Sequence, residues 1–162
     1  MTATALDPET GLGDGDHDAL RLWLRLFTCS TMIEREIGAA LKREFGSTLP
    51  RFDLLAQLER NPHGLRLGAL SERLLVTGGN VTWLVNSLEA DGLVARRRAP
   101  DDGRAWIVAL TPEGRRAFAA MARAHERWIA ALLGDLSTRE RTQLHSLLGH
   151  LKSSIRHEES PR

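Results

Sequence analysis

The apolar residues of this chain depart from one spacing over a single segment. Between residues 93 and 111 apolar and polar side chains alternate, as in "LVARRR" and "RAWIVALT", and the turn-forming segment "APDDG" joins the two runs. On either side of this region apolar residues recur every three or four positions, which is typical of helices. The chain is therefore expected to be mainly α, with a small β-hairpin between residues 93 and 111.

Six helices are expected around this hairpin. The first spans about residues 17–45, where the Gly46-Ser47 pair ends it. Three short helices follow, in "PRFDLLAQLER", "GALSERLLV" and "TGGNVTWLVNSLEADGL", the last with a buried stripe of Val81, Leu84, Val85 and Leu88. After the hairpin, Thr111 and Ser137 are the predicted N-caps of two long helices. Two adjacent short helices followed by a hairpin form a winged helix-turn-helix.

Composition and cysteine usage exclude several classes of protein. The formal net charge is +1 and charged residues make up 27%, as in ordinary soluble globular proteins. No apolar run approaches the roughly 18 residues that span a bilayer, and residues 1–16 lack the pattern of a secretory signal. Cys29 has no second cysteine to pair with. We expect a cytoplasmic protein with no membrane contact and a mobile acidic tail over residues 1–16.

The most specific pattern lies in "NVTWLVNSLEADGLVARRRAPDDGRAWIVALTPEG". A helix ends in Leu-Glu-x-x-Gly-Leu-Val, an Asp-x-Arg turn follows, and an alternating strand ends in Leu-Thr-x-x-Gly. Over about residues 20–157 the chain resembles the MarR family of bacterial transcription regulators, whose pattern is matched by Asp102, Arg104, Leu110, Thr111 and Gly114. One position departs from it. Many members have a second arginine where this chain has Gly103, so the tip of the hairpin is smaller and less cationic.

The resemblance implies a homodimer that binds DNA and a small molecule. In this family the first and last helices of two subunits interlock, and a ligand pocket lies between that region and the DNA-binding lobe. Residues 17–162 would form a single domain, with 17–45 and 112–157 as dimerisation helices and 50–111 as the winged helix-turn-helix lobe. The sequence of the first helix supports a dimer independently of the resemblance, because this helix is apolar on two faces and must be buried on two sides.

The start of the third short helix is expected to touch base edges in the major groove. A recognition helix needs short polar side chains there, and this one has Thr77, Gly78, Gly79, Asn80 and Thr82. An asparagine can pair with adenine through two hydrogen bonds. A loosened helix start with a solvated Asn80 is the alternative. Trp83 is expected to pack against the neighbouring helix, and a contact with DNA is the alternative.

The hairpin is expected to contact DNA through Arg96, Arg97, Arg98, Asp102 and Arg104. Because a narrow minor groove has a negative potential that attracts guanidinium groups, Arg104 is the expected inserted residue. Asp102 would pair with Arg104 or a neighbour and hold it in position. A solvated, charged hairpin is the alternative interpretation.

The effector would bind aromatic and cationic residues from three helices. The candidates are Trp23, Phe27, Ser30, Arg51, Phe52, His125 and Trp128. Aromatic rings supply a flat apolar wall, and Arg51 or His125 would hold a carboxylate or phosphate. Packing in the core is the alternative for each aromatic residue. The segment "LPRFDLLAQLER" is similar to the subgroup that regulates aromatic-acid catabolism, so the resemblance implies an aromatic carboxylate or an aryl-CoA thioester.

Other chemistry finds less support in the sequence. Relatives that sense hydroperoxides have their first-helix cysteine where this chain has Trp23, and this chain has no tyrosine, so Cys29 is expected to be a buried small apolar residue. His145 and His150 do not share a helix face well, and neither a metal site nor a cofactor is predicted. The sequence also lacks a glycine-rich phosphate loop and a Gly-x-Ser-x-Gly elbow, so no enzyme is predicted.

The predicted function is that of a ligand-responsive repressor, released from a pseudo-palindromic DNA operator by a small aromatic acid or aryl-CoA thioester. Two alternatives stay open. One is a redox-responsive regulator that uses Cys29. The other is a winged-helix protein-interaction adaptor, which the acidic tail and the small net charge would suit.

Overall fold

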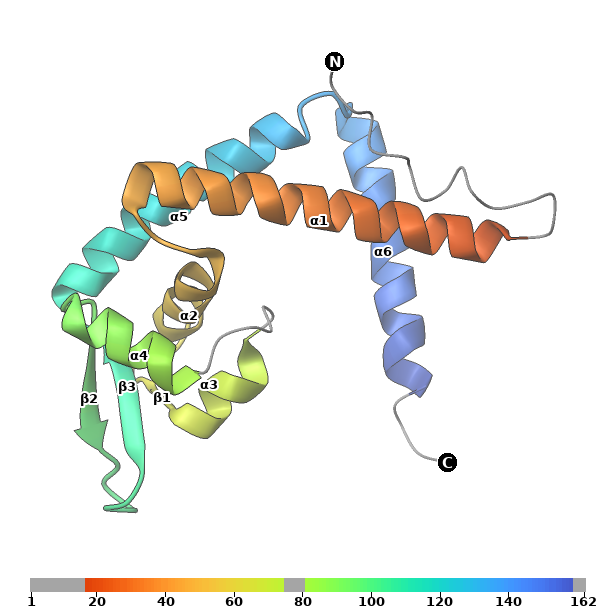
Figure 1. The fold of residues 1–162 in the computed structure, drawn as a ribbon. Coiled ribbons are helices and arrows are strands. Elements are labelled where there is room, and N and C mark those ends of the chain that lie inside the picture. The colour runs from red at the N-terminus through yellow and green to blue at the C-terminus, as the bar shows by residue number, and fades with distance from the viewer. Residues whose placement is uncertain (1–16, 75–80, 159–162) are drawn as a thin grey trace. The chain divides into compact units, whose positions relative to one another are not determined.

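The computed structural model describes residues 17–74 and 81–158 (Figure 1). Its elements are α1 (Asp18–Phe45), α2 (Leu49–Glu59), β1 (Leu65–Arg66), α3 (Leu67–Arg73), α4 (Val81–Ala90), β2 (Val94–Arg98), β3 (Trp106–Leu110), α5 (Pro112–Leu132) and α6 (Thr138–Glu158). The prediction of a mainly α fold with a small hairpin is confirmed. The predicted tail, residues 1–16, lies outside the described residues. Contacts divide the chain into two compact units, Met1–His125 and Glu126–Arg162, with the boundary inside α5.

The sheet has a third strand that the sequence analysis missed. Its order is β1-β3-β2, and both pairs are antiparallel. In β1, Leu65 lies opposite Val108 and Arg66 lies opposite Ile107. A strand of two residues has no alternation of its own to reveal it. Figure 1 shows the hairpin of β2 and β3 extending away from α2 and α4, and we call residues 94–110 the wing.

The core of the first unit lies where α2, α3 and α4 meet the sheet. The fully buried side chains are Leu54, Leu55, Leu58, Leu70, Leu84, Val85, Leu88, Val94 and Val108, together with Ile37 and Leu41 of α1. Each contributes about 1.5–3 kcal/mol through burial. The predicted stripe of α4 is confirmed at three of its positions, and Val81 is half-buried. Within residues 17–74 and 81–158, no helix is both long and apolar enough to cross a membrane.

Thr111 and Gly114 form the junction between the sheet and α5. Thr111 Oγ1 donates to the carbonyl of Gly92 at 2.6 Å and accepts from the N–H of Gly114 at 3.0 Å, so the predicted N-cap is confirmed. The Thr111 N–H donates to the Leu93 carbonyl at 3.1 Å. A Cβ on Gly114 would lie 1.9 Å from that same carbonyl oxygen. The Leu-Thr-x-x-Gly pattern therefore has a physical cause, the close approach of α5 to the residue that precedes β2.

The second unit begins its last helix with a capping box. Ser137 Oγ donates to Glu140 Oε2 at 2.6 Å and accepts from the Glu140 N–H at 3.3 Å, while the Ser137 N–H donates to the same carboxylate at 2.7 Å. The side-chain hydrogen bond from Ser137, and then the backbone one, lower the pKa of Glu140. The predicted Ser137 cap is confirmed. The apolar stripe of α6 stays between 39% and 56% exposed at Leu144, Leu147, Leu148, Leu151 and Ile155.

Candidate nucleic-acid interface

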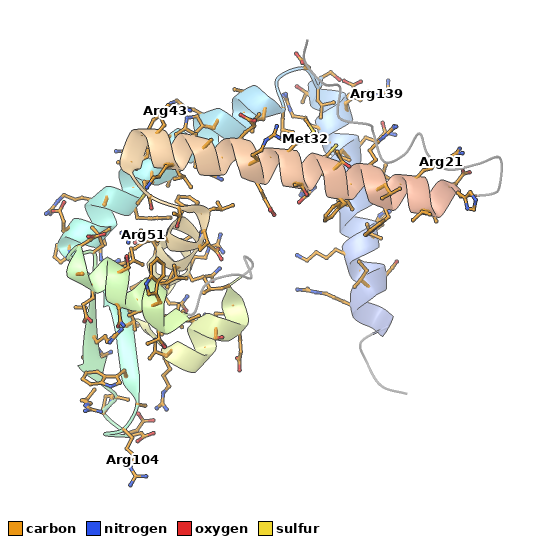
Figure 2. The ribbon with its side chains drawn as sticks, in the orientation of Figure 1. Arg21, Met32, Arg43, Arg51, Arg104 and Arg139 are labelled. Carbon is orange, nitrogen blue, oxygen red and sulfur yellow. The ribbon has the colours of Figure 1, made fainter. Side chains whose placement is uncertain are left out.

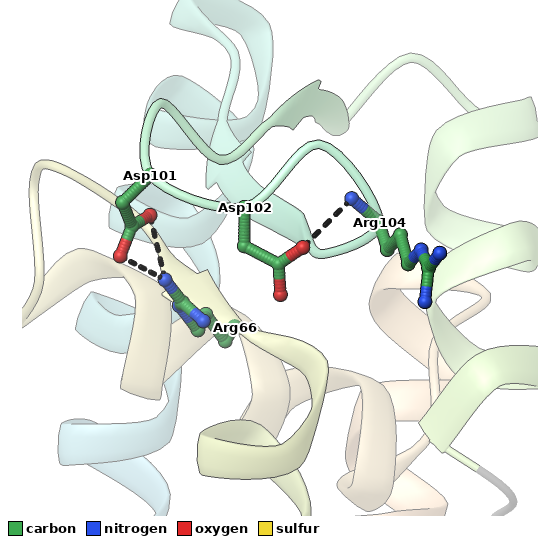
Figure 3. A network of polar contacts seen from close by, with 4 residues as sticks. All are labelled: Arg66, Asp101, Asp102 and Arg104. Atoms are coloured by element: carbon green, nitrogen blue, oxygen red, sulfur yellow. Dashed lines mark hydrogen bonds and ion pairs between the residues drawn. The ribbon is translucent and has the colours of Figure 1, made fainter.

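The tip of the wing is held by its two aspartates. Nη2 of Arg66, the residue just before α3, donates to both carboxylate oxygens of Asp101 at 2.7 and 2.6 Å (Figure 3). Asp102 Oδ1 accepts a hydrogen bond of 2.9 Å from the backbone N–H of Arg104 (Figure 3). The first contact ties the tip to the helix-turn-helix, and the second fixes the turn itself. Sequence reasoning missed Arg66 and Asp101, because 35 positions separate them.

The side chain of Arg104 points into solvent from this fixed turn. Figure 2 shows it at the free end of the hairpin, directed away from the helices of its unit. Among the described residues, no hydrogen bond or ion pair engages its guanidinium. Asp102 thus contacts Arg104 through the backbone and not through the guanidinium, since an aspartate reaches the N–H two residues on most directly. The cation keeps all of its donors for an external acceptor.

Arg96 joins the wing to α4. Its Nη2 donates to Asn86 Oδ1, its backbone N–H donates to Glu89 Oε1 at 3.2 Å, and its Nε lies 3.6 Å from Glu89 Oε2. With a side chain only 22% exposed, Arg96 is a bracing residue of the lobe. Its charge still adds to the local positive potential.

Arg97 and Arg98 are also partnered inside the protein. Arg97 Nη2 donates to the His63 carbonyl at 3.0 Å. The Arg98 guanidinium lies 3.9 Å from the centroid of the Trp106 ring and donates to the Gly103 carbonyl at 2.8 Å. The position where many relatives have a second arginine therefore offers its carbonyl to Arg98, and this contact stiffens the wing.

The recognition helix is described only from Val81 onward. Four of the predicted base contacts, Thr77, Gly78, Gly79 and Asn80, lie outside the described residues. Thr82 is exposed in the first turn of α4. The expectation that Trp83 packs against the neighbouring helix is wrong, because this side chain is 62% exposed. Leu84, Val85 and Leu88 already fill the contact with the core, and the helical period turns Trp83 away from it.

Two of the predicted effector residues are in direct contact. The rings of Phe52 and His125 stack with centroids 4.8 Å apart, and Phe118 lies 5.5 Å from Phe52. Desolvation by burial lowers the pKa of His125. The imidazole is therefore uncharged at neutral pH and offers a hydrogen-bond donor in place of a positive charge.

The guanidinium of Arg51 joins α2 to α4. Nη1 donates to Ser87 Oγ and Nη2 to the carboxylate of Asp91, and the side chain is 13% exposed. Its Nε is buried without a hydrogen-bond partner among the described residues. Arg51 is therefore a structural link to the C-terminal end of the recognition helix.

The remaining effector candidates lie elsewhere. On α1, Trp23 and Phe27 stack at 5.7 Å and are 56% and 58% exposed, and Ser30 is exposed beside them. Trp128 is half-buried in the second unit. The expected burial of Cys29 is wrong for this chain, since its side chain is exposed. The cause is that α1 buries only Ile37, Ala40 and Leu41. Across the described residues His, Cys, Asp and Glu nowhere form a group of three suited to a metal ion.

The helix pair α3 and α4, followed by the wing, defines a winged helix-turn-helix protein. A family model described as the MarR family matches residues 45–105. The chain is 33% identical over 134 residues to the transcriptional activatory protein BadR of Rhodopseudomonas palustris, which covers 80% of this chain and 76% of BadR. The chain belongs to the MarR family of DNA-binding transcriptional regulators, as its resemblance predicted.

Solved structures agree with this assignment. The crystal structure of a MarR family transcriptional regulator from Silicibacter pomeroyi matches with a TM-score of 0.74 at 34% identity, over 88% of this chain and 99% of that one. Sco3205 of Streptomyces coelicolor, solved in complex with DNA, shares the fold with a TM-score of 0.73 at 21% identity, over 88% of this chain and 90% of that one. The relatives found are regulators and not enzymes.

Proposed function

We propose that the chain is a homodimeric repressor that binds a pseudo-palindromic DNA operator in the cytoplasm and leaves it when an aromatic effector binds. The wing carries this proposal. Arg104 is anchored through its backbone, while its guanidinium stays free for an external acceptor. This arrangement suits a narrow minor groove, whose negative potential attracts a guanidinium.

The remaining DNA contacts follow from the family and the lobe. Thr77, Gly78, Gly79, Asn80 and Thr82 are assigned to base edges and phosphates in the major groove on their residue types. Asp102 holds the turn, and Arg96, Arg97 and Arg98 brace the wing while adding positive potential. These three arginines also make contacts within the lobe. Removing any of them would therefore lower DNA affinity partly by disturbing the geometry of the wing.

Two exposed apolar stripes support a dimer. On α1, Leu22, Trp23 and Phe27 are 67%, 56% and 58% exposed, and the stripe of α6 is likewise exposed. A soluble monomer rarely leaves such contiguous apolar surface in water. A second copy that covers these helices would bury it and would set the spacing of two recognition helices.

The effector proposal rests on Arg51 and its neighbour Phe52. An anion that binds Arg51 competes with Asp91, the residue that ties α4 to α2. The chain would then have two conformations, one with Arg51 bound to Asp91 and one with Arg51 bound to the ligand. A ligand shifts the equilibrium between two conformations when it binds them with different affinities. Phe52, the next residue of α2, stacks with His125, and an aromatic wall of this kind favours an aromatic carboxylate or an aryl-CoA thioester.

A footprint on the DNA upstream of the gene tests the proposal. The full chain should protect a symmetric site, and benzoate or benzoyl-CoA should release it. Arg51→Gln should lose the release, whereas Arg60→Gln, a change at an exposed arginine at the end of the same helix, should keep it. Deleting the gene should raise transcription from the promoter next to the site. A fall would make the chain an activator, as its relative BadR is named.

A further inference from the structure

The exposed face of α4 carries one large apolar side chain. Trp83 is 62% exposed, whereas its neighbours Leu84 and Val85 are 2% and 0% exposed. The helical period places Trp83 with Asn86 and Ala90 on the face opposite the buried stripe. An isolated tryptophan on an arbitrary surface would mean little. This one lies in the first turn of α4, and the N-terminal residues of a recognition helix are the ones that contact base edges in the major groove.

The polar side chains beside Trp83 are partly occupied by the protein itself. Asn86 Oδ1 accepts a hydrogen bond from the Arg96 guanidinium, and Glu89 Oε1 accepts one from the Arg96 backbone at 3.2 Å. Within the described ranges, no hydrogen bond or ring contact holds Trp83. Trp83 is therefore a side chain of this face that stays available to a partner.

The chemistry of an indole restricts what that partner offers. Its rings are flat and apolar, and its only polar group is the Nε1–H donor. The apolar group that the major groove presents is the C5-methyl of thymine. Resting on the proposed DNA-binding function, we propose that Trp83 is a specificity-determining residue that reads one thymine in each half-site through contact between its indole and that methyl group.

A thymine-to-uracil scan tests this, because uracil lacks only the C5-methyl. The operator is first selected from random-sequence duplexes with the full wild-type chain. A wild type that selects no sequence would overturn the proposed function together with this inference. Once an operator is in hand, a uracil at the same position of both half-sites should lower wild-type affinity about fifteenfold, which is about fourfold for each methyl-sized group removed.

Variants separate base reading from a structural role. Trp83→Ala should bind the thymine and uracil operators equally and keep the wild-type salt dependence, while Trp83→Phe should recover part of the discrimination. Arg35→Ala, a change at an exposed residue of α1, should leave the uracil profile unchanged. Thermal melting of Trp83→Ala should match the wild type, since the indole is exposed. A flat wild-type scan, unchanged discrimination in Trp83→Ala, or a clearly lowered melting temperature would overturn the assignment.

Discussion

At the residue scale, the wing depends on side chains that are distant in the sequence. Arg66 anchors Asp101 across 35 positions, and Asp102 then fixes the backbone of Arg104. Both partners of the ion pair are well exposed, at 45% and 72%. Such a pair adds little to global stability, about 0–1 kcal/mol. Its role is therefore to position the wing.

Arg66→Ala should weaken operator binding by about threefold to tenfold, or roughly 0.7–1.4 kcal/mol, with almost no change in the melting temperature. Fluorescence anisotropy with labelled operator and a thermal melt measure the two effects. The double variant Arg66→Asp with Asp101→Arg should regain much of the affinity, because the pair is restored with reversed polarity. Equal affinities of Arg66→Ala and the wild type would show that the pair does not position the wing.

Gly114 provides a second prediction at this scale. In Gly114→Ala the new Cβ would meet the Leu93 carbonyl oxygen at 1.9 Å, so the junction between sheet and α5 must shift. We expect a loss of about 2–4 kcal/mol in the free energy of unfolding, measured by urea denaturation. Gly38→Ala is the matched control. It has no atom within 4 Å of the added carbon, and as a helical position it should gain up to about 1 kcal/mol. Similar results for both variants would contradict the close approach.

At the element scale, α2 couples the recognition helix to α5 through consecutive residues. Arg51 bonds to Asp91 at the end of α4, and Phe52 stacks on His125 of α5. Burial lowers the pKa of His125 in the folded chain. Between that lowered pKa and the ordinary value of about 6.5, the unfolded chain binds more protons than the folded one. Folding stability therefore rises with pH in this window.

The contribution of a neutral His125 to the free energy of unfolding should be fully present above pH ~6.5. This contribution should be lost as the pH falls through the lowered folded-state pKa. Chemical denaturation at a series of pH values measures this slope. His125→Phe keeps the ring stack and should flatten the slope, whereas His63→Gln, a change at an exposed histidine, should leave it unchanged. A slope in His125→Phe equal to that of the wild type would assign the pH dependence to other groups.

Elements were predictable where their cause is local. The caps at Thr111 and Ser137 and the turn of the wing involve residues within three positions of one another, so the sequence pattern predicts them. The strand β1 exists only because β3 pairs with it, and no pattern of two residues reveals that. Arg51 and Arg66 acquire their roles from partners 35 to 40 positions away. Those roles need the folded chain.

The predictions that Trp83 and Cys29 are buried were wrong for a related reason. Both were expected to be buried on residue type alone, yet both are exposed. Burial depends on which helix face meets the core, and in α4 smaller aliphatic residues occupy that face. In α1 the buried residues are Ile37, Ala40 and Leu41, which all lie in the last third of the helix. The base contacts predicted at Thr77, Gly78, Gly79 and Asn80 stay predictions.

At the scale of the whole molecule, the exposed apolar stripes of α1 and α6 are the surfaces that a second copy of the chain would cover in the proposed dimer. Leu147→Glu places a charge in the α6 stripe and should convert the protein to a monomer, because burying an unpaired carboxylate is costly. Sedimentation equilibrium measures the mass. Ser146→Glu, on the opposite helix face by the 3.6-residue period, should remain dimeric. A wild type that sediments as a monomer of 18.0 kDa would contradict the dimer.

DNA binding through the wing is tested by the salt dependence of operator affinity. Each phosphate neutralised by the protein contributes about −0.9 to the slope of log affinity against log salt. Wild type should show a steep negative slope, and Arg104→Ala should bind more weakly at every salt concentration with a slope shallower by about one. Arg35→Ala on α1 removes the same charge far from the wing and should match the wild type. Indifference of the wild type to DNA at low salt, or equal curves for Arg104→Ala and wild type, would contradict DNA binding through the wing.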